Sequence, residues 1–141
     1  MTYNPLRLEN YNLDILFRLD TLIDGLNGGT STVVVPTTSN IVINQRFSNI
    51  FIKYNLNTDM VLQLADSLFS MFGVIHITIF NDRSDGQDLT VPIPNNGGNI
   101  IYQNGDTMLI PYGKYAELSL NTVEIIDATT YTTLSLYHIG D

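Results

Sequence analysis

Residues 115–126, YAELSLNTVEII, form the longest run in the chain with the pattern of a β-strand. Ala116, Leu118 and Leu120 alternate with polar residues, and this period of two is typical of a strand with one buried face. Residues 74–80, VIHITIF, repeat the pattern with an isoleucine at every second position. These two stretches predict long strands that contribute one face each to a core.

Shorter runs of the same kind surround them, separated by turns rich in Pro, Gly and Asn. They cover Thr32–Val35, Ile41–Asn44, Ile50–Leu56, Leu89–Ile93, Ile100–Tyr102, Thr107–Ile110 and Tyr131–Ile139. The stretch Asp59–Phe72 fits either a helix or a strand through Leu62 and Leu64 with a helical turn at Asp66–Phe72. We assign the turn, and we expect a mainly β fold, an antiparallel, jelly-roll-like β-sandwich over residues 30–141, with a barrel as the near alternative.

The N-terminal segment, residues 1–29, has a different character. Asn4-Pro5 is a typical helix start, and Gly28-Gly29 after Leu26 predicts an end and a flexible joint. Apolar residues at helical spacing form a wide stripe between them. The residues that we expect to mediate oligomerisation are Leu13, Leu16, Leu19, Ile23 and Leu26.

A helix with so wide an apolar face is not stable alone in water. It packs on its own body, on copies of itself, or in a groove of another protein. We favour self-association, and a homotrimer over a dimer, because a wide stripe suits three strands better than two. With fewer than three heptads, the pattern leaves the number of copies open.

The composition excludes several classes of protein. The 141 residues include no Cys, which excludes disulfide scaffolds and thiol chemistry. The net charge of -8, with only six Lys and Arg, is unsuited to binding nucleic acid. No apolar run is long enough to insert in a membrane. Only 14% of residues are charged, while Asn and Thr each occur fifteen times, so we expect other subunits to cover part of the surface.

Metal ligands are few. His76 and His138 each fall within a strand pattern, so polar-face histidines are expected, with a site of two His and a carboxylate as the alternative. The acidic run Asp82, Asp85 and Asp88 resembles a calcium loop, but Arg83 occupies a ligand position. We expect a solvated hairpin loop between the flanking strands, with Asp85-Gly86 as its turn and an irregular Ca²⁺ site as the alternative.

Catalytic patterns are not found in the sequence. Glu117 and Glu124 are seven residues apart and point to opposite faces of a regular strand, which does not favour a paired-carboxylate site. We therefore expect no enzyme, cofactor or bound metal. Among the tyrosines that gather in the last third of the chain, Tyr112 and Tyr115 are the candidates for a ligand face that would bind carbohydrate.

The segment GDTMLIPYGKYAEL, residues 105–118, resembles the passage of strand, Pro-x-Gly turn and strand found in small phage structural β-domains. Residues 80–91, FNDRSDGQDLTV, have similar turn chemistry. With its N-terminal helix, Gly joint and β-body, the chain resembles small phage virion structural proteins of the head-fibre, capsid-decoration or short tail-fibre type. The resemblance implies a virion component assembled in the host cytoplasm, with other virion proteins and a host-surface glycan as partners, and implies no catalytic residues.

Overall fold

The computed structural model describes residues 31–141. The predicted helix and joint, residues 1–29, and the oligomerisation residues Leu13, Leu16, Leu19, Ile23 and Leu26 lie outside the described residues. The described part is mainly β, as predicted. Within it, no helix has the length and apolar character needed to cross a membrane.

Ten strands and two short 3₁₀ turns make up the described chain. The strands are β1 (Ser31–Val34), β2 (Asn40–Ile43), β3 (Asn49–Tyr54), β4 (Val61–Leu64), β5 (Gly73–Asn81), β6 (Leu89–Pro92), β7 (Ile100–Tyr102), β8 (Thr107–Ile110), β9 (Tyr115–Ile125) and β10 (Tyr131–Gly140). The 3₁₀ turns are η1 (Asp66–Phe69) and η2 (Asn96–Gly98). The strand and helical turn predicted between Asp59 and Phe72 are confirmed as β4 and η1.

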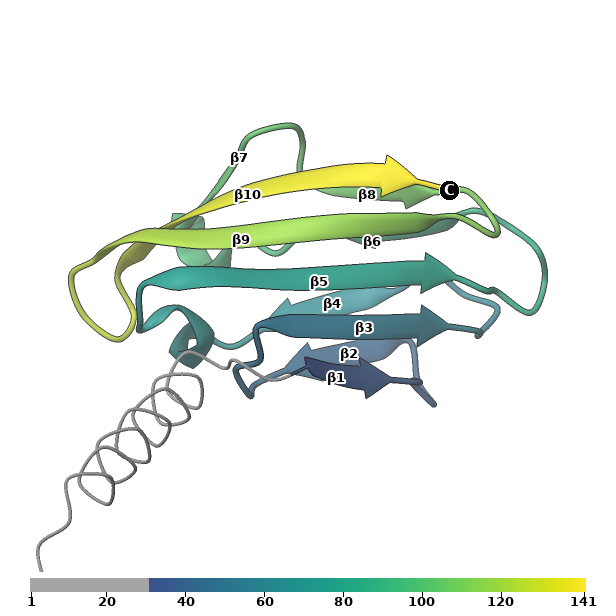
Figure 1. The fold of residues 1–141 in the computed structure, drawn as a ribbon, viewed down its shortest axis with the longest axis horizontal. Coiled ribbons are helices and arrows are strands. Elements are labelled where there is room, and N and C mark those ends of the chain that lie inside the picture. The colour runs from purple at the N-terminus through teal and green to yellow at the C-terminus, as the bar shows by residue number, and fades with distance from the viewer. Residues whose placement is uncertain (1–30) are drawn as a thin grey trace, which may run out of the picture.

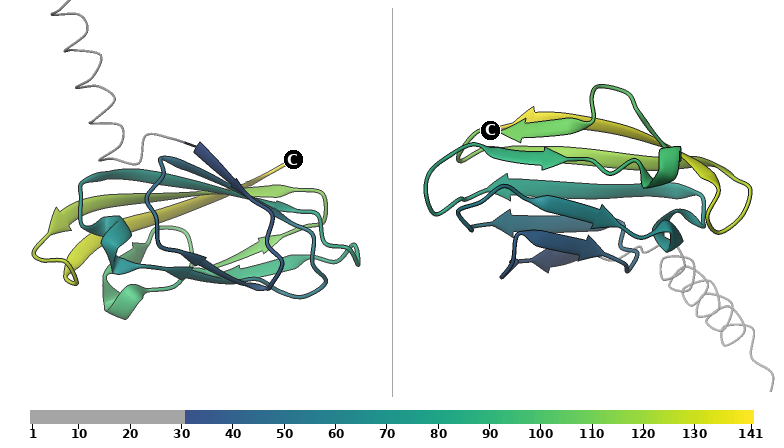
Figure 2. Two further views of the ribbon diagram at one scale, coloured as in Figure 1. Left: turned by 90° about the horizontal axis from the view of Figure 1, so that it is seen from below. Right: turned by 180° about the vertical axis from the view of Figure 1, so that it is seen from behind.

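The strands lie in two layers (Figures 1 and 2). One layer is a six-stranded sheet in the order β1-β3-β5-β9-β10-β7, and the pairs β2-β4 and β6-β8 lie behind it. The core fills the space between them. Ile77 and Leu118 contribute from the large sheet, and Leu62, Val91 and Ile110 from the two pairs, all of them buried.

The prediction of an antiparallel arrangement is wrong for the first half of the chain. Strands β1, β3 and β5 pair in parallel, and so do β2 and β4, because the chain crosses between the layers after each strand. Only β5, β9 and β10 form the antiparallel centre of the large sheet, while β7 joins β10 in parallel. Residue alternation predicts which face of a strand is buried, but it does not predict the direction of the neighbouring strand.

The expected hairpin over residues 81–88 is also not formed. The turn itself is present, with Gly86 at a φ of 69° and its N–H bonded to the carbonyl of Arg83. However, β5 before it belongs to the large sheet, whereas β6 after it pairs with β8. The Asn104-Gly105 turn similarly joins β7 and β8, which lie in different sheets. Glycine predicts the change of direction, and tertiary packing decides the partner.

Candidate functional site

The face of the six-stranded sheet that points away from the core has a shallow groove of about 580 Å³. Alternate residues of β3, β5 and β9 point outward, and the strand register brings them together. Phe51, Thr78 and Glu117 are neighbours across the three strands, and Asn49, His76 and Ser119 form the next row. The groove is lined by Asn49, Phe51, His76, Ile77, Thr78, Tyr115, Glu117 and Ser119.

The groove contains polar side chains between two aromatic residues. His76 Nδ1 lies 3.1 Å from Ser119 Oγ, within hydrogen-bond distance. Glu117 is exposed beside them, and Phe51 and Tyr115 lie at either side on different strands. Hydrogen-bonding groups between aromatic rings match a ligand with hydroxyl groups and apolar faces, such as a sugar.

The two predicted tyrosines do not come together. Tyr115 lines the groove, and its ring packs over the backbone of Gly140. Tyr112 is half exposed in the turn between β8 and β9 and does not line the groove. Phe51 could not be recognised as a site residue from the sequence, because an aromatic residue on the outer side of a strand becomes informative only when the register places it in the same groove as Tyr115.

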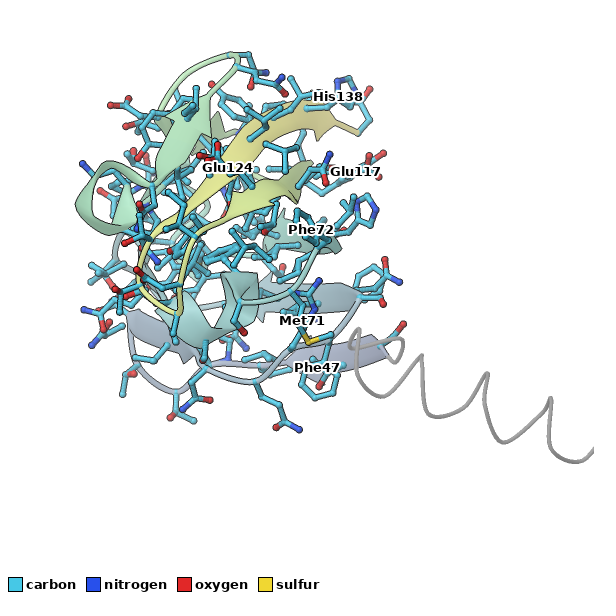
Figure 3. All side chains as sticks on the ribbon, turned by 90° about the vertical axis from the view of Figure 1, so that its left-hand side faces the viewer. Phe47, Met71, Phe72, Glu117, Glu124 and His138 are labelled. Carbon is cyan, nitrogen blue, oxygen red and sulfur yellow. The ribbon has the colours of Figure 1, made fainter. Side chains whose placement is uncertain are left out.

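The histidines are polar-face residues, as expected. His138 is on β10, where it pairs with Glu117 of β9, and Figure 3 shows both side chains on the same side of the sheet. His76 is on β5, with β9 between the two histidines. Across residues 31–141, no group of three or more His, Asp and Glu side chains is placed to hold a metal ion.

The two glutamates of β9 lie toward opposite ends of that strand and are both exposed (Figure 3). The simple parity rule for their faces does not apply, because a bulge interrupts the pairing of β9 with β10 at Thr132 and Thr133. The structure does not bring Glu117 and Glu124 into one site.

The acidic run of residues 82–88 is organised by its own arginine. The guanidinium of Arg83 is buried and donates from Nε and Nη2 to the two carboxylate oxygens of Asp85, at 2.9 and 2.7 Å. It also donates to Asp59 Oδ1 at 3.0 Å, and to the carbonyls of Asn57 and Asp88. The hydrogen bonds that Arg83 donates to Asp85 lower the pKa of the Asp85 carboxyl.

Consequently, Arg83 provides the positive charge that a calcium ion would bring to such a loop. The carboxylate of Asp82 instead lies near Lys53, with one oxygen 3.6 Å from Lys53 Nζ. Asp88 contributes its backbone carbonyl to Arg83. The three carboxylates of the predicted alternative Ca²⁺ site therefore do not converge on one point.

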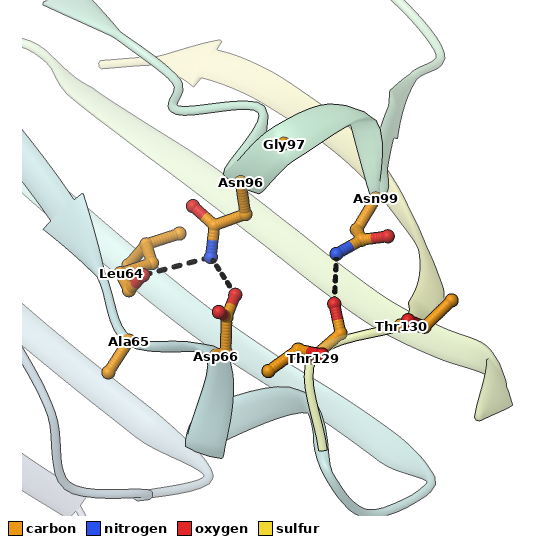
Figure 4. A pocket seen from close by; sticks show the side chains of 8 residues that line it. All are labelled: Leu64, Ala65, Asp66, Asn96, Gly97, Asn99, Thr129 and Thr130. Carbon is orange, nitrogen blue, oxygen red and sulfur yellow. Dashed lines mark hydrogen bonds between the residues drawn. The ribbon is translucent and has the colours of Figure 1, made fainter. Parts of the chain in front are cut away.

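A second cleft, of about 730 Å³, opens where η1, η2 and the turn between β9 and β10 meet (Figure 4). Asn96 has a left-handed backbone with a φ of 46°, and its Nδ2 lies 2.9 Å from the carbonyl of Leu64. The same amide lies 2.9 Å from the hydroxyl of Tyr131, which donates to Asp66 Oδ1 at 2.8 Å. Asn99 donates to the carbonyl of Thr129 at 2.8 Å.

These bonds join three segments that are distant in the sequence. Burial raises the pKa of Tyr131 to about 12, and the hydrogen bond to Asp66 acts in the same direction. The ring of Tyr131 also stacks on Phe69, with centroids 5.0 Å apart. Because the side chains of the cleft are bonded to one another, its main role is to hold this end of the molecule together.

Comparison of the chain with protein-family models, with curated proteins and with solved structures finds no match.

Proposed function

We propose that the protein is a non-enzymatic structural component of a phage virion, of the head-fibre or capsid-decoration type. It assembles in the host cytoplasm as a homo-oligomer, with a trimer favoured over a dimer, through a helix within residues 1–29. Other virion proteins are its further partners.

The observation that carries this proposal is a group of exposed apolar side chains on the outer face of the six-stranded sheet, beside the polar groove. Val74, Ile101, Val123 and Leu136 are all exposed on β5, β7, β9 and β10. Ile101 pairs with the half-buried Leu134 across β7 and β10, and Asn121 separates this pair from Val74. Water-facing sides of sheets are normally polar, and several exposed apolar side chains on one such face favour a surface that another protein covers.

One feature of the sequence and one of the structure support the same proposal. Low charge, at 14% of residues, fits a protein that buries surface in an assembly. The segment that resembles phage structural domains adopts the corresponding local form, with β8, a turn at Gly113 with a φ of 77°, and then β9.

The test is the mass of the full chain in solution by light scattering. A trimer of the 15.8 kDa chain is expected at micromolar concentration. Leu16→Asp or Ile23→Asp, on the predicted apolar stripe, should reduce it to a monomer. Leu109→Asp, an exposed position on β8, is the matched control and should remain oligomeric. A monomeric full chain would overturn the proposal.

The groove on the sheet favours a second candidate function, the binding of a saccharide. Phe51 and Tyr115 line the groove together with polar groups, and Glu117 supplies hydrogen-bond acceptors. A glycan array should give hits that Phe51→Ala and Glu117→Gln remove. Tyr112→Ala, outside the groove, should retain them. An array without hits, with correctly folded protein, contradicts this candidate.

A further inference from the structure

The groove on the outer face of the six-stranded sheet carries a negative charge. Glu117, exposed on β9, is the one carboxylate among its described lining residues, and none of these residues is Lys or Arg. The other polar side chains of the lining, which offer hydrogen bonds, are Asn49, His76, Thr78 and Ser119. A ligand in this groove therefore meets one carboxylate and no permanent positive charge.

The cations of the described residues have partners outside the groove. The Lys and Arg side chains of residues 31–141 are Arg46, Lys53, Arg83 and Lys114. Arg46 donates to carbonyls in and after η1, and Arg83 donates within the loops after β3 and β5. Lys53 and Lys114 are close to groove residues in the sequence, but they form ion pairs with Asp82 and Asp141. Among the described residues, no lysine or arginine is therefore placed to receive an acidic group of a ligand.

The carboxylate of Glu117 favours one kind of ligand over another. A carboxylate only accepts hydrogen bonds, so it pairs with hydroxyl and N–H groups. Two like charges about 5 Å apart repel each other enough to weaken binding several-fold, even in a well-hydrated groove. His76 in the lining and His138, which pairs with Glu117 from β10, can add positive charge on acidification (Figure 3), so the tests below use about pH 8.

We propose that the groove binds uncharged saccharides and discriminates against acidic ones, with Glu117 as the residue that determines this specificity. Hydroxyl groups of the sugar donate to the carboxylate of Glu117, and Phe51 and Tyr115 offer apolar contacts to the faces of its rings. This inference rests on the saccharide binding proposed for the groove. It adds the class of saccharide and the residue that selects it.

The first experiment is a glycan array at about pH 8 that contains uncharged, sialylated and uronic-acid glycans. We expect the strongest hits among the uncharged glycans. For the strongest of these, one hydroxymethyl group is oxidised to a carboxylate, and the methyl ester of this acid serves as an uncharged control of nearly the same size. The acid should bind at least about fivefold more weakly than its ester. This difference should narrow between about 20 mM and about 500 mM NaCl, because salt screens exposed charges.

Two variants of the full chain separate the effect of charge from that of shape. Glu117→Gln should weaken the binding of the uncharged glycan, yet strengthen the binding of the acid or leave it unchanged, whereas a misfolded variant would lose both. Glu124→Gln makes the same substitution at an exposed position of the same strand, outside the groove, and should change neither. Titrations followed by NMR give the dissociation constants, and circular dichroism verifies the fold.

The outcomes distinguish this inference from the function on which it rests. Acidic glycans among the strongest hits, or an acid that binds as tightly as its ester, overturn the inference and leave saccharide binding standing. Equal weakening of the uncharged glycan and the acid in folded Glu117→Gln overturns it as well. An array without hits, with correctly folded protein, overturns saccharide binding itself, and this inference falls with it.

Discussion

Arg83 connects the loop after β5 to the loop after β3, and Arg83→Met tests how much this connection stabilises the protein. All five N–H groups of the guanidinium have acceptors, in Asp59, Asp85, Asn57 and Asp88. The side chain is 10% exposed. Methionine keeps much of the apolar stem and removes every one of these bonds.

The magnitude follows from which acceptors regain water. Hydrogen bonds to charged groups contribute roughly 1.5–3 kcal/mol each. The carboxylate of Asp59, 61% exposed, is readily hydrated after the change, so most of its contribution is recovered. The carboxylate of Asp85, 33% exposed, is less readily hydrated and loses more. We expect the free energy of unfolding to fall by about 2–4 kcal/mol, which lowers the melting temperature by about 6–16 °C for a body of this size.

The assay is urea unfolding followed by circular dichroism, with Lys53→Met as the matched control. The ammonium of Lys53 is 56% exposed and 3.6 Å from its carboxylate, so its loss should cost about 0.5 kcal/mol or less. Arg83→Lys should recover less than half of the loss, because an ammonium does not form the paired bonds to Asp85. A loss below about 1 kcal/mol for Arg83→Met, or one equal to that of the control, would refute the reasoning.

The pH dependence provides an independent check of the same ion pair. Arg83 lowers the pKa of Asp85 in the folded state. The carboxylate therefore adds stability above its unfolded pKa, and this contribution is lost as the pH falls through the folded value. The difference in stability between the native protein and Arg83→Met should narrow on acidification, and a constant difference would contradict this assignment.

Three further changes test other parts of the structure. Ser135→Ala should leave stability unchanged or raise it by up to about 1 kcal/mol, because Ser135 Oγ is buried and has no hydrogen-bond partner within the described residues; a clear loss in urea unfolding would count against this. The pKa of Tyr131, raised from 10.0 to about 12, means that its neutral hydroxyl adds stability below pH 10 that disappears as the pH rises toward 12. A titration of the tyrosines at alkaline pH, followed by ultraviolet absorbance, should show one tyrosine with a raised pKa that Tyr131→Phe removes. An unchanged titration curve in this variant would contradict the assignment to Tyr131. Gly140→Ala would place a Cβ 2.7 Å from Cζ of Tyr115, so we expect about 1–3 kcal/mol of destabilisation and a shifted Tyr115 NMR signal; an unchanged spectrum would show that the ring is not held there.

The positions of most strands could be predicted from the sequence, because alternation reports burial directly. Ile77 and Leu118 are fully buried, as the patterns around them predict. β10 is different, since its buried face carries Ser135 and Thr133 while Leu136 is exposed. Here hydrophobicity alone would select the wrong face as the core. The packing of the two layers decides the orientation of β10, and alternation contains no information about that.

The candidate site was predictable only in part. Tyr115 was identified from its residue type, whereas the approach of His76 to Ser119 depends on the register of β5 and β9, 43 residues apart in the sequence. Arg83 was noted in the sequence only as an unsuitable calcium ligand. Its role as the internal cation depends on Asp59, which lies 24 residues earlier. Pairings of this kind are produced by topology and leave no local pattern.

The place of β9 in the middle of the six-stranded sheet has a consequence for biosynthesis. β9 pairs with β5 on one side and β10 on the other, yet residues 115–125 are synthesised after eight of the ten described strands. Until they leave the ribosome, β5 presents an unpaired, isoleucine-rich edge. A chain terminated before residue 115 lacks the strand that joins the parallel half to the rest of the sheet, and such intermediates are prone to aggregate. Synthesis of β9, rather than of the first strands, is therefore the step that allows the two halves of the large sheet to join.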